Sequence, residues 1–260
     1  MAAVIPDILA RIVEQKRGSL PRLKSQRAEL EQRAATRPLA RDFRAALVAN
    51  PPAIIAEVKK ASPSKGVFTH QFDPASIART YAEGGAAALS VLTDEGFFHG
   101  CLADLEAARA AVSVPVLRKD FTIHELHVVE AAAHGADAIL LIAAILTPAE
   151  MRRFRELAAQ FRMAALVEVH DDEELGPALD SGAAIVGVNN RDLHTFEVRL
   201  ETSERLAGRI PANVVKVAES GIDSHADVVR LRAAGFSAFL VGEHLMKSGD
   251  PAASIRALRS

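Results

Sequence analysis

The chain of 260 residues has one cysteine, Cys101, no tryptophan and one tyrosine. A lone cysteine cannot form a disulfide within the chain, and no Cys/His cluster has the spacing of zinc ligands, so we expect no disulfide and no structural metal. An excess of charge of one sign is also missing, because 31 basic and 33 acidic side chains give a net charge of −2. This balance disfavours nucleic acid or an anionic membrane as a partner.

Long hydrophobic runs are absent as well. The longest run, residues 138–146, is about half of the ~20 residues that a membrane-spanning helix needs, and it favours a buried strand. The N-terminal stretch MAAVIPDILARIVEQKR has an early proline and an acidic residue, and it lacks the apolar segment of a signal peptide. We therefore expect a protein of the reducing cytoplasm with no membrane partner.

The first part of the chain is helical in character. Residues 4–47 are rich in Leu, Ala, Arg, Glu and Gln, with apolar side chains at helical spacing. This pattern predicts two helices, interrupted around residues 18–21. Pro51 and Pro52 end the helical character, because proline lacks the amide donor that a helix needs. We predict an N-terminal helical extension over residues 1–50 that packs on a catalytic unit of residues 51–260.

Eight short β-branched or leucine-rich runs follow, with helical stretches between them. Their starts are roughly 20 to 35 residues apart, about the length of one strand and one crossover helix. Most of the runs are continuously apolar, as parallel strands covered on both faces require. They occupy residues 54–58, 87–92, 114–119, 138–143, 164–169, 184–188, 214–219 and 238–242.

Eight such units predict an α/β protein with a (β/α)8 TIM barrel. An open, doubly wound sheet is the alternative, but the even spacing and the lack of a glycine-rich nucleotide turn after the first strand disfavour it. In (β/α)8 barrels the reacting groups lie at the C-terminal ends of the strands. Candidate functional residues are therefore the polar side chains that end the eight runs.

Charged side chains end three of these strands. Glu57 and Lys59 are two residues apart, so they share one face of the first strand. Lys119 ends the third strand and Glu168 lies at the end of the fifth. A lysine beside carboxylates can donate a proton, and a glutamate can accept one. An isolated Glu-x-Lys is more often a surface ion pair, but here it ends an apolar strand and precedes a turn-rich loop.

The last three strands end in groups suited to binding a polar, anionic ligand. Asn189 and Arg191 offer amide and guanidinium donors after the sixth strand, although Arg191 with Asp192 is as compatible with a local turn ion pair. Gly221 and Gly242 follow the seventh and eighth strands. In this architecture the loops after those strands form the usual phosphate cradle. The sequence therefore predicts a small phosphorylated substrate.

These strand-end motifs carry a family resemblance. In chain order, IIAEVKKASPSKG, VPVLRKDF, LVEVH, VGVNNRDL, VAESGI and FLVGEHLM resemble the indole-3-glycerol-phosphate synthases of tryptophan biosynthesis, from about Pro51 to Met246. The resemblance implies a carboxy-lyase that closes the pyrrole ring of 1-(2-carboxyphenylamino)-1-deoxyribulose 5-phosphate with loss of CO2 and water. It implies no cofactor and no metal. The N-terminal segment resembles the family only in character, so no functional residue is carried over from it.

The same resemblance implies residue roles. Lys119 corresponds to the general acid that protonates the substrate carbonyl, and Lys59 to an anchor that also donates a proton during dehydration. Of Glu57 and Glu168, one takes a proton while the other assists loss of hydroxide or fixes Lys119, and the sequence does not divide these roles. The remaining positions correspond to substrate or phosphate contacts, with Glu243 contributing through its backbone amide: Asn189, Arg191, Glu219, Ser62, Ser220, Gly221, Gly242 and Glu243.

Two other functions fit the same barrel. A Schiff-base aldolase or sugar-phosphate isomerase would use Lys119 as a nucleophile. A non-catalytic barrel would keep phosphate affinity without turnover, although a binder needs no paired acid and base. Apolar residues near the expected barrel mouth are candidates to hold an aromatic ring or are plain packing: Phe97, Phe98, Phe121 and Leu193. We expect a monomer or a weak homodimer.

Overall fold

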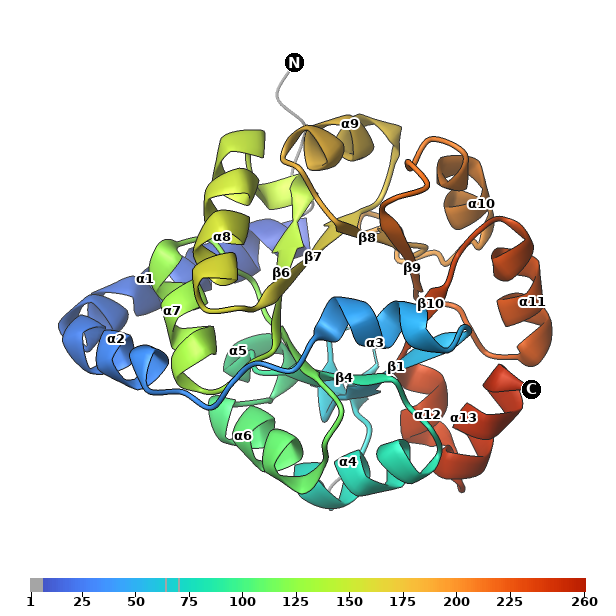
Figure 1. Ribbon diagram of the computed structural model, residues 1–260, viewed down its shortest axis with the longest axis horizontal. Coiled ribbons are helices and arrows are strands. Elements are labelled where there is room, and N and C mark those ends of the chain that lie inside the picture. Colours follow the sequence, from blue (N-terminus) through green and yellow to red (C-terminus); the bar gives the residue numbers. More distant parts are fainter. Residues whose placement is uncertain (1–6, 64, 70) are drawn as a thin grey trace.

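The computed structural model describes residues 7–63, 65–69 and 71–260. Eight parallel strands close into a barrel in the order β1-β10-β9-β8-β7-β6-β5-β4 (Figure 1). Each strand matches one of the eight predicted runs to within two residues at either end, which confirms the (β/α)8 barrel. The strands are β1 (Ala53–Val58), β4 (Ala88–Leu92), β5 (Val116–Lys119), β6 (Ala138–Ile142), β7 (Ala164–Val169), β8 (Ile185–Asn189), β9 (Val215–Glu219) and β10 (Ala238–Val241).

Helices surround the barrel and connect successive strands (Figure 1). Several begin at a capping side chain, as α8 does at Thr147, which accepts a hydrogen bond from the amide of Glu150 while Glu150 bonds back to Thr147. The outer ring comprises α4 (Pro74–Glu83), α6 (Leu102–Ala111), α7 (Glu125–Ala133), α8 (Pro148–Gln160), α9 (Asp172–Asp180), α10 (Glu201–Ala207), α11 (His225–Ala233) and α13 (Pro251–Arg259). Shorter elements are α5 (Glu95–Phe98), the 3-10 turn η1 (Ala143–Ile145), α12 (Glu243–Lys247) and a hairpin of β2 (Ala61–Ser62) and β3 (Gly66–Val67).

Alternation along the strands divides the core into two apolar clusters. Ile55, Leu117 and Leu166 face the barrel interior, where they pack with Leu140 and Val217. The residues between them face outward and pack under the ring of helices. A polar residue placed two positions after an interior residue therefore also faces the barrel axis.

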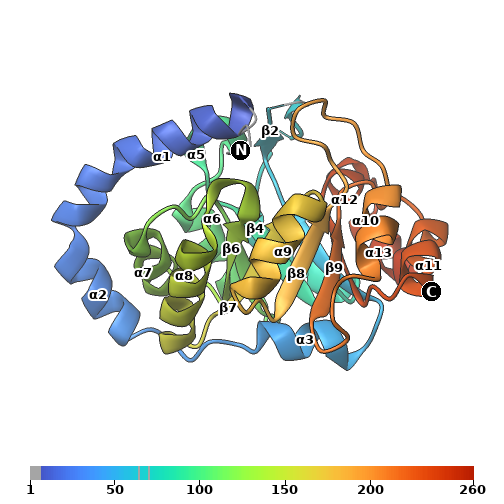
Figure 2. The ribbon, with the colours of Figure 1, turned by 90° about the horizontal axis from the view of Figure 1, so that it is seen from above.

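The N-terminal segment closes the barrel at both ends. Helix α1 (Asp7–Ser25) crosses one end and α3 (Phe43–Ala49) lies under the other, joined by α2 (Arg27–Ala35) (Figure 2). Leu9 and Ile12 from α1, and Phe43 and Leu47 from α3, belong to the same apolar cluster as the barrel interior. Burial of these four side chains gives the segment a packing role on the barrel.

The predicted interruption at residues 18–21 is wrong. Helix α1 continues through Gly18 and Pro21, and the chain turns only at Gln26. Proline at position 21 removes one intrahelical hydrogen bond, but buried Ile12 and Leu23 hold the helix on either side of it. Tertiary packing therefore overrides the local breaker signal. Among the residues that the structure describes, no helix is long and apolar enough to span a membrane.

Candidate active site

A cavity of about 860 Å³ opens at the C-terminal ends of the strands, beneath α1. Every site residue predicted from the sequence lines it, although the twelve positions come from the ends of six different barrel strands and the loops that follow them. They are Glu57, Lys59, Ser62, Lys119, Glu168, Asn189, Arg191, Glu219, Ser220, Gly221, Gly242 and Glu243.

Strand periodicity explains why the charged residues converge. Lys119 lies two positions after Leu117, and Glu168 two positions after Leu166, so both side chains follow interior apolar residues. Glu219 follows Val217 in the same way. In a closed parallel barrel all such positions point toward one axis, so residues far apart in sequence meet over the last apolar layer.

Lys119 is the centre of an acidic pocket. Its Nζ lies 3.0 Å from Oε2 of Glu168 and 3.8 Å from Oε2 of Glu219. Burial by itself lowers the pKa of Lys119, but the charges of Glu168, Glu219 and Glu57 outweigh it and the pKa ends above its usual value. Lys119 is therefore an ammonium ion at neutral pH.

The pKa values of Glu168 and Glu219 are shifted in opposite directions. Burial raises the pKa of Glu168, but Lys119 and His170 overcome it and hold the pKa well below its usual range. Burial and the negative charge of Glu168 raise the pKa of Glu219 to about 8. Oε1 of Glu219 is buried without a hydrogen-bond partner among the described residues. At pH 7 the pocket thus holds one ionised and one protonated carboxyl group beside an ammonium ion.

Glu57 and Lys59 form a second acid–base pair. Lys59 Nζ lies 2.5 Å from Glu57 Oε1, and both side chains are largely buried. The pair sits against the backbone of Gly242, directly after β10, where a Cβ atom would collide with Glu57 Oε1 and crowd Lys59 Nζ. Glycine at position 242 therefore makes room for the pair.

Hydrogen-bond donors and acceptors line the wall between β7 and β9. Asn189 Nδ2 donates to Glu168 Oε1 at 3.2 Å, and Ser220 Oγ donates to Asn189 Oδ1 at 2.9 Å. Behind them, Asn190 donates to the carbonyl oxygen of Ser220 at 3.0 Å. Ser220 and Gly221 both have left-handed φ angles, 66° and 75°, so the chain turns sharply away after β9.

The rim beside β10 is rich in cations. Glu243 lies near three of them, with Lys247 at 2.5 Å, Arg191 at 3.7 Å and Lys65 at 3.9 Å. Hydrogen bonding to Lys247, followed by the charges of these cations, lowers the pKa of Glu243. Together with Lys59, this rim carries more positive than negative charge, which favours a bound anion.

An apolar wall faces that rim. Phe98 and Phe121 line the cavity with their ring centroids 6.1 Å apart, and Leu193 also lines it. Phe121 follows β5, which lies across the barrel from β9 and β10. Phe97, the fourth apolar candidate, instead lies against the guanidinium group of Arg11, 5.7 Å from its ring centroid. The cavity therefore has an apolar end and a cationic end on opposite sides of the charged centre.

Within the part of the chain that the structure describes, the acidic side chains of the cavity do not form a metal site. Over residues 7–63, 65–69 and 71–260, no group of three or more His, Cys, Asp or Glu side chains is arranged to hold a metal ion. The carboxylates of the cavity face lysine ammonium groups.

Comparison with known proteins decides the family. The family model described as indole-3-glycerol phosphate synthase matches residues 9–258. The chain is 51% identical over 258 residues to the indole-3-glycerol phosphate synthase of Aromatoleum aromaticum, and 48% identical over 258 residues to that of Albidiferax ferrireducens. Each match covers 97% of this chain and 98% of the relative.

The chain belongs to the indole-3-glycerol phosphate synthase family. The family predicted from the strand-end motifs is therefore confirmed, together with the function in its name. A solved structure, thiamine phosphate pyrophosphorylase from Pyrococcus furiosus, is similar with a TM-score of 0.60 and 17% identity, covering 80% of this chain and 93% of that one. At that identity the likeness shows the barrel fold alone.

Two features of this indole-3-glycerol phosphate synthase family member were missed from the sequence. The first is the roof of the cavity, which Ile8, Leu9 and Ile12 of α1 line. The family resemblance includes an extra helix over the barrel mouth, but this segment matched it only in helical character, so no site residue was assigned in it. The second is His170, directly after β7, whose ring lies between Glu168 and Glu174.

Arg118 precedes Lys119 on β5 but faces away from the barrel axis, because neighbouring side chains of a strand alternate in direction. Its guanidinium group is buried, 2.9 Å from Asp120 and 2.8 Å from Glu130, and it also donates to the carbonyl of His127. Because successive side chains of a strand point to opposite faces, Lys119 faces the barrel axis and Arg118 faces the helices.

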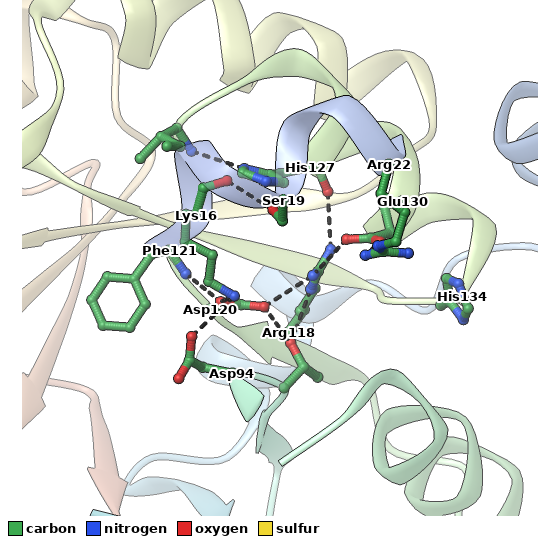
Figure 3. A network of polar contacts seen from close by, with 12 residues as sticks. Lys16, Ser19, Arg22, Asp94, Arg118, Asp120, Phe121, His127, Glu130 and His134 are labelled. Atoms are coloured by element: carbon green, nitrogen blue, oxygen red, sulfur yellow. Dashed lines mark hydrogen bonds and ion pairs between the residues drawn. The ribbon is translucent and has the colours of Figure 1, made fainter. Parts of the chain in front are cut away.

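The network around Arg118 ties α1 to the end of β5 (Figure 3). Lys16 of α1 lies 2.5 Å from Asp120 and 3.1 Å from Asp94. Burial raises the pKa of Asp120, but Arg118 and Lys16 outweigh it and hold the pKa far below its usual value. The roof helix is therefore attached by ion pairs to the residue that follows Lys119.

Proposed function

We propose that this chain converts 1-(2-carboxyphenylamino)-1-deoxyribulose 5-phosphate to indole-3-glycerol phosphate, CO2 and water in tryptophan biosynthesis. The cavity suits each part of that substrate. Its apolar end, with Phe98 and Phe121, accepts an aromatic ring, and its cationic end accepts a phosphate. The charged centre between them holds the groups that move protons.

Ring closure needs an acid at the substrate ketone. When the carboxyl-bearing ring carbon attacks the carbonyl carbon, a C–C bond forms and the carbonyl electron pair moves to oxygen. Lys119 donates a proton to that oxygen, and its ammonium charge stabilises the developing alkoxide. Glu168, 3.0 Å away, keeps Lys119 charged and oriented. The C–CO2 bond then breaks, and its electrons restore the aromatic ring.

Dehydration needs an acid and a base on one intermediate. The C–OH bond breaks as the anilino nitrogen supplies its electron pair, a proton from Lys59 completes the leaving water, and Glu57 removes the proton from the carbon next to nitrogen. The 2.5 Å contact of Glu57 with Lys59 supports assigning this step to that pair, and it leaves Glu168 to fix Lys119. This division is what the sequence could not provide.

Residues around the Lys119–Glu168 and Lys59–Glu57 pairs bind and orient the substrate. Asn189 and Glu219 contact the polar middle of the substrate, and Arg191 and Ser62 contact it from the surrounding loops. The phosphate occupies the rim near Ser220, Gly221, Gly242 and the amide of Glu243, where Lys59 and Lys65 add positive charge.

We also propose a domain organisation, a cellular location and an oligomeric state for this chain. Residues 1–50 act as an extension of one structural domain with the barrel of residues 51–260, supported by the shared packing of Leu9, Ile12, Phe43 and Leu47 with the barrel interior. The chain works in the cytoplasm as a monomer or weak homodimer. Sedimentation of the purified protein at several concentrations tests the oligomeric state, and a stable higher oligomer contradicts it.

One observation carries the proposal: Lys119 lies among three glutamates in a cavity with opposite apolar and cationic ends. The test is to mix the purified chain with 1-(2-carboxyphenylamino)-1-deoxyribulose 5-phosphate and to record indole fluorescence, for which a chain without tryptophan gives little background. We expect fluorescence to rise with enzyme concentration. No product, or a borohydride-trapped adduct between Lys119 and a keto-sugar phosphate, contradicts the proposal and favours an aldolase.

A further inference from the structure

The ring of His170 lies between two carboxylates from different elements. Its Nε2 is 3.3 Å from Oε1 of Glu168 on β7, and its Nδ1 is 3.0 Å from Oε2 of Glu174 on α9. The backbone amide of His170 also donates to Glu174 Oε2 at 2.8 Å. The Nε2 contact is an ion pair and not an aligned hydrogen bond, because Nε2 has no hydrogen-bond partner among the described residues.

The two contacts determine the charge of the ring. Ionised carboxylates only accept hydrogen bonds, and a neutral imidazole carries a proton on one nitrogen alone. Two carboxylates within 3.3 Å of the ring nitrogens therefore stabilise the imidazolium form. Burial by itself lowers the pKa of His170, but Glu168 and Glu174 outweigh it and raise the pKa to about 10.

His170 stands behind the catalytic cavity rather than in it. Glu168 lines the main cavity, whereas the His170 ring lines a second cavity of about 670 Å³ on the outer side of β7 and β8. His170 follows Val169, the last residue of β7, so its side chain lies outside the regular alternation of the strand. From the second cavity its Nε2 faces Oε1 of Glu168.

Glu168 is consequently held by three groups at two oxygens. Oε2 faces Lys119 at 3.0 Å, while Oε1 faces Asn189 Nδ2 at 3.2 Å and His170 Nε2 at 3.3 Å. Rotation of the carboxylate would exchange the oxygens and break both sets of contacts. Of the two groups that face Oε1, only His170 carries a charge.

We propose that His170 is a positioning residue for the reaction: as an imidazolium anchored by Glu174, it fixes the orientation and charge of Glu168, which in turn holds Lys119. This inference rests on the proposed role of Glu168. Glu174 lies in the first turn of α9, a helix capped by Asp171, so a regular element supports the anchor. His170 itself touches no substrate and transfers no proton.

The test uses two substitutions at one position. His170→Asn leaves an amide near Glu174 but no donor within reach of Glu168, whereas His170→Gln extends an amide toward Glu168. We expect His170→Asn to lower kcat by at least ~10-fold with KM changed less than about 3-fold, since a small misplacement of a catalytic group costs rate rather than binding. His170→Gln recovers part of that loss.

A matched control lies elsewhere on the barrel. His134, at the end of α7, pairs with Glu106 at 2.8 Å and does not line the cavity. His134→Asn removes a histidine–glutamate contact of similar length and should leave kcat and KM unchanged. If His170→Asn does not fold, Glu174→Gln removes the anchor without touching Glu168, and a decrease in kcat in the same direction is expected.

A double-mutant cycle separates this inference from the proposed function. In a Glu168→Gln background, His170→Asn should cost less than about 2-fold further, because its effect passes through Glu168. Equal losses in both backgrounds, or a wild-type kcat in His170→Asn while Glu168→Gln is impaired, overturn the positioning role alone. A wild-type kcat in Glu168→Gln overturns the proposed role of Glu168, and the positioning role with it.

Discussion

Lys119 Nζ and Glu168 Oε2 lie 3.0 Å apart although the two residues are separated by 49 positions in the chain. Lys119 ends β5 and Glu168 lies near the end of β7, with β6 between them. The contact exists because both side chains face the barrel axis at the same height. Glu219 enters the same space from β9, beside Gly187, where any Cβ atom would collide with its Oε1. Proton transfer in this cavity therefore depends on barrel closure.

Replacing Lys119 tests the proton donor. Lys119→Ala should lower kcat by at least ~10²-fold, because it removes a positioned general acid. The measurement is the rate of indole fluorescence increase at saturating substrate. Lys216→Ala is the control, since Lys216 lies on β9 but binds the carbonyl of Ala207 outside the cavity. Near-normal turnover of Lys119→Ala would exclude its assigned role.

Lys59 and Lys60 are adjacent but face different surroundings. Lys59 contacts Glu57 in the cavity, whereas Lys60 Nζ lies 5.9 Å from the ring centroid of Phe72. Lys59→Ala should lower kcat/KM by at least ~10-fold through both a higher KM and a lower kcat, since it removes a charged hydrogen-bond donor. Lys60→Ala should leave both constants close to wild type. Equal effects of the two substitutions would show that Lys59 acts only through net charge.

Glu219 gives a pH dependence of stability with a defined sign. Its folded pKa of about 8 lies above the unfolded value, so the folded state binds the extra proton and stability falls as pH rises toward 8. The slope reaches at most about 1.4 kcal/mol per pH unit. His170 adds a fall of the same sign only above its unfolded pKa of about 6.5. Between about pH 5 and 6.5, His127 acts in the opposite sense, because burial lowers its pKa to about 4 and stability then rises with pH. The difference in slope between the wild type and a Glu219 variant, measured by denaturant unfolding, therefore isolates Glu219.

Between about pH 5 and 6.5 the slope of stability against pH should be more positive in Glu219→Gln than in the wild type, by up to about 1.4 kcal/mol per pH unit. Glu156→Gln, on the exposed face of α8, is the control and should leave the slope as in the wild type. An unchanged slope in Glu219→Gln would mean that Glu219 is ionised in the folded protein at neutral pH.

Lys16 tests the attachment of the roof helix. Lys16→Met leaves Asp94 and Asp120 buried without their lysine, so the free energy of unfolding should fall by about 3 kcal/mol. Lys24→Met, on the exposed side of the same helix, should change it by less than about 0.5 kcal/mol. Urea unfolding of both variants measures the difference. Similar stabilities would show that Leu9 and Ile12 alone hold α1 on the barrel.

Local pattern was enough for the strands and for most of the site. The apolar runs, their spacing and the polar residues at the C-terminal ends depend only on residues near one another in sequence. The eight strands were therefore predicted correctly, and the twelve candidate positions all line one cavity. The same local logic failed at Gly18 and Pro21, because buried contacts of α1 outweigh a local helix breaker.

The sequence by itself determined the fold and the family, since hydrophobic periodicity and strand-end motifs are written along the chain. Only the tertiary structure decided which glutamate pairs with which lysine, that α1 forms the roof, and that His170 stands behind Glu168. These facts depend on distances of a few ångströms between distant segments. Such distances arise from barrel closure and side-chain packing, which no local pattern encodes.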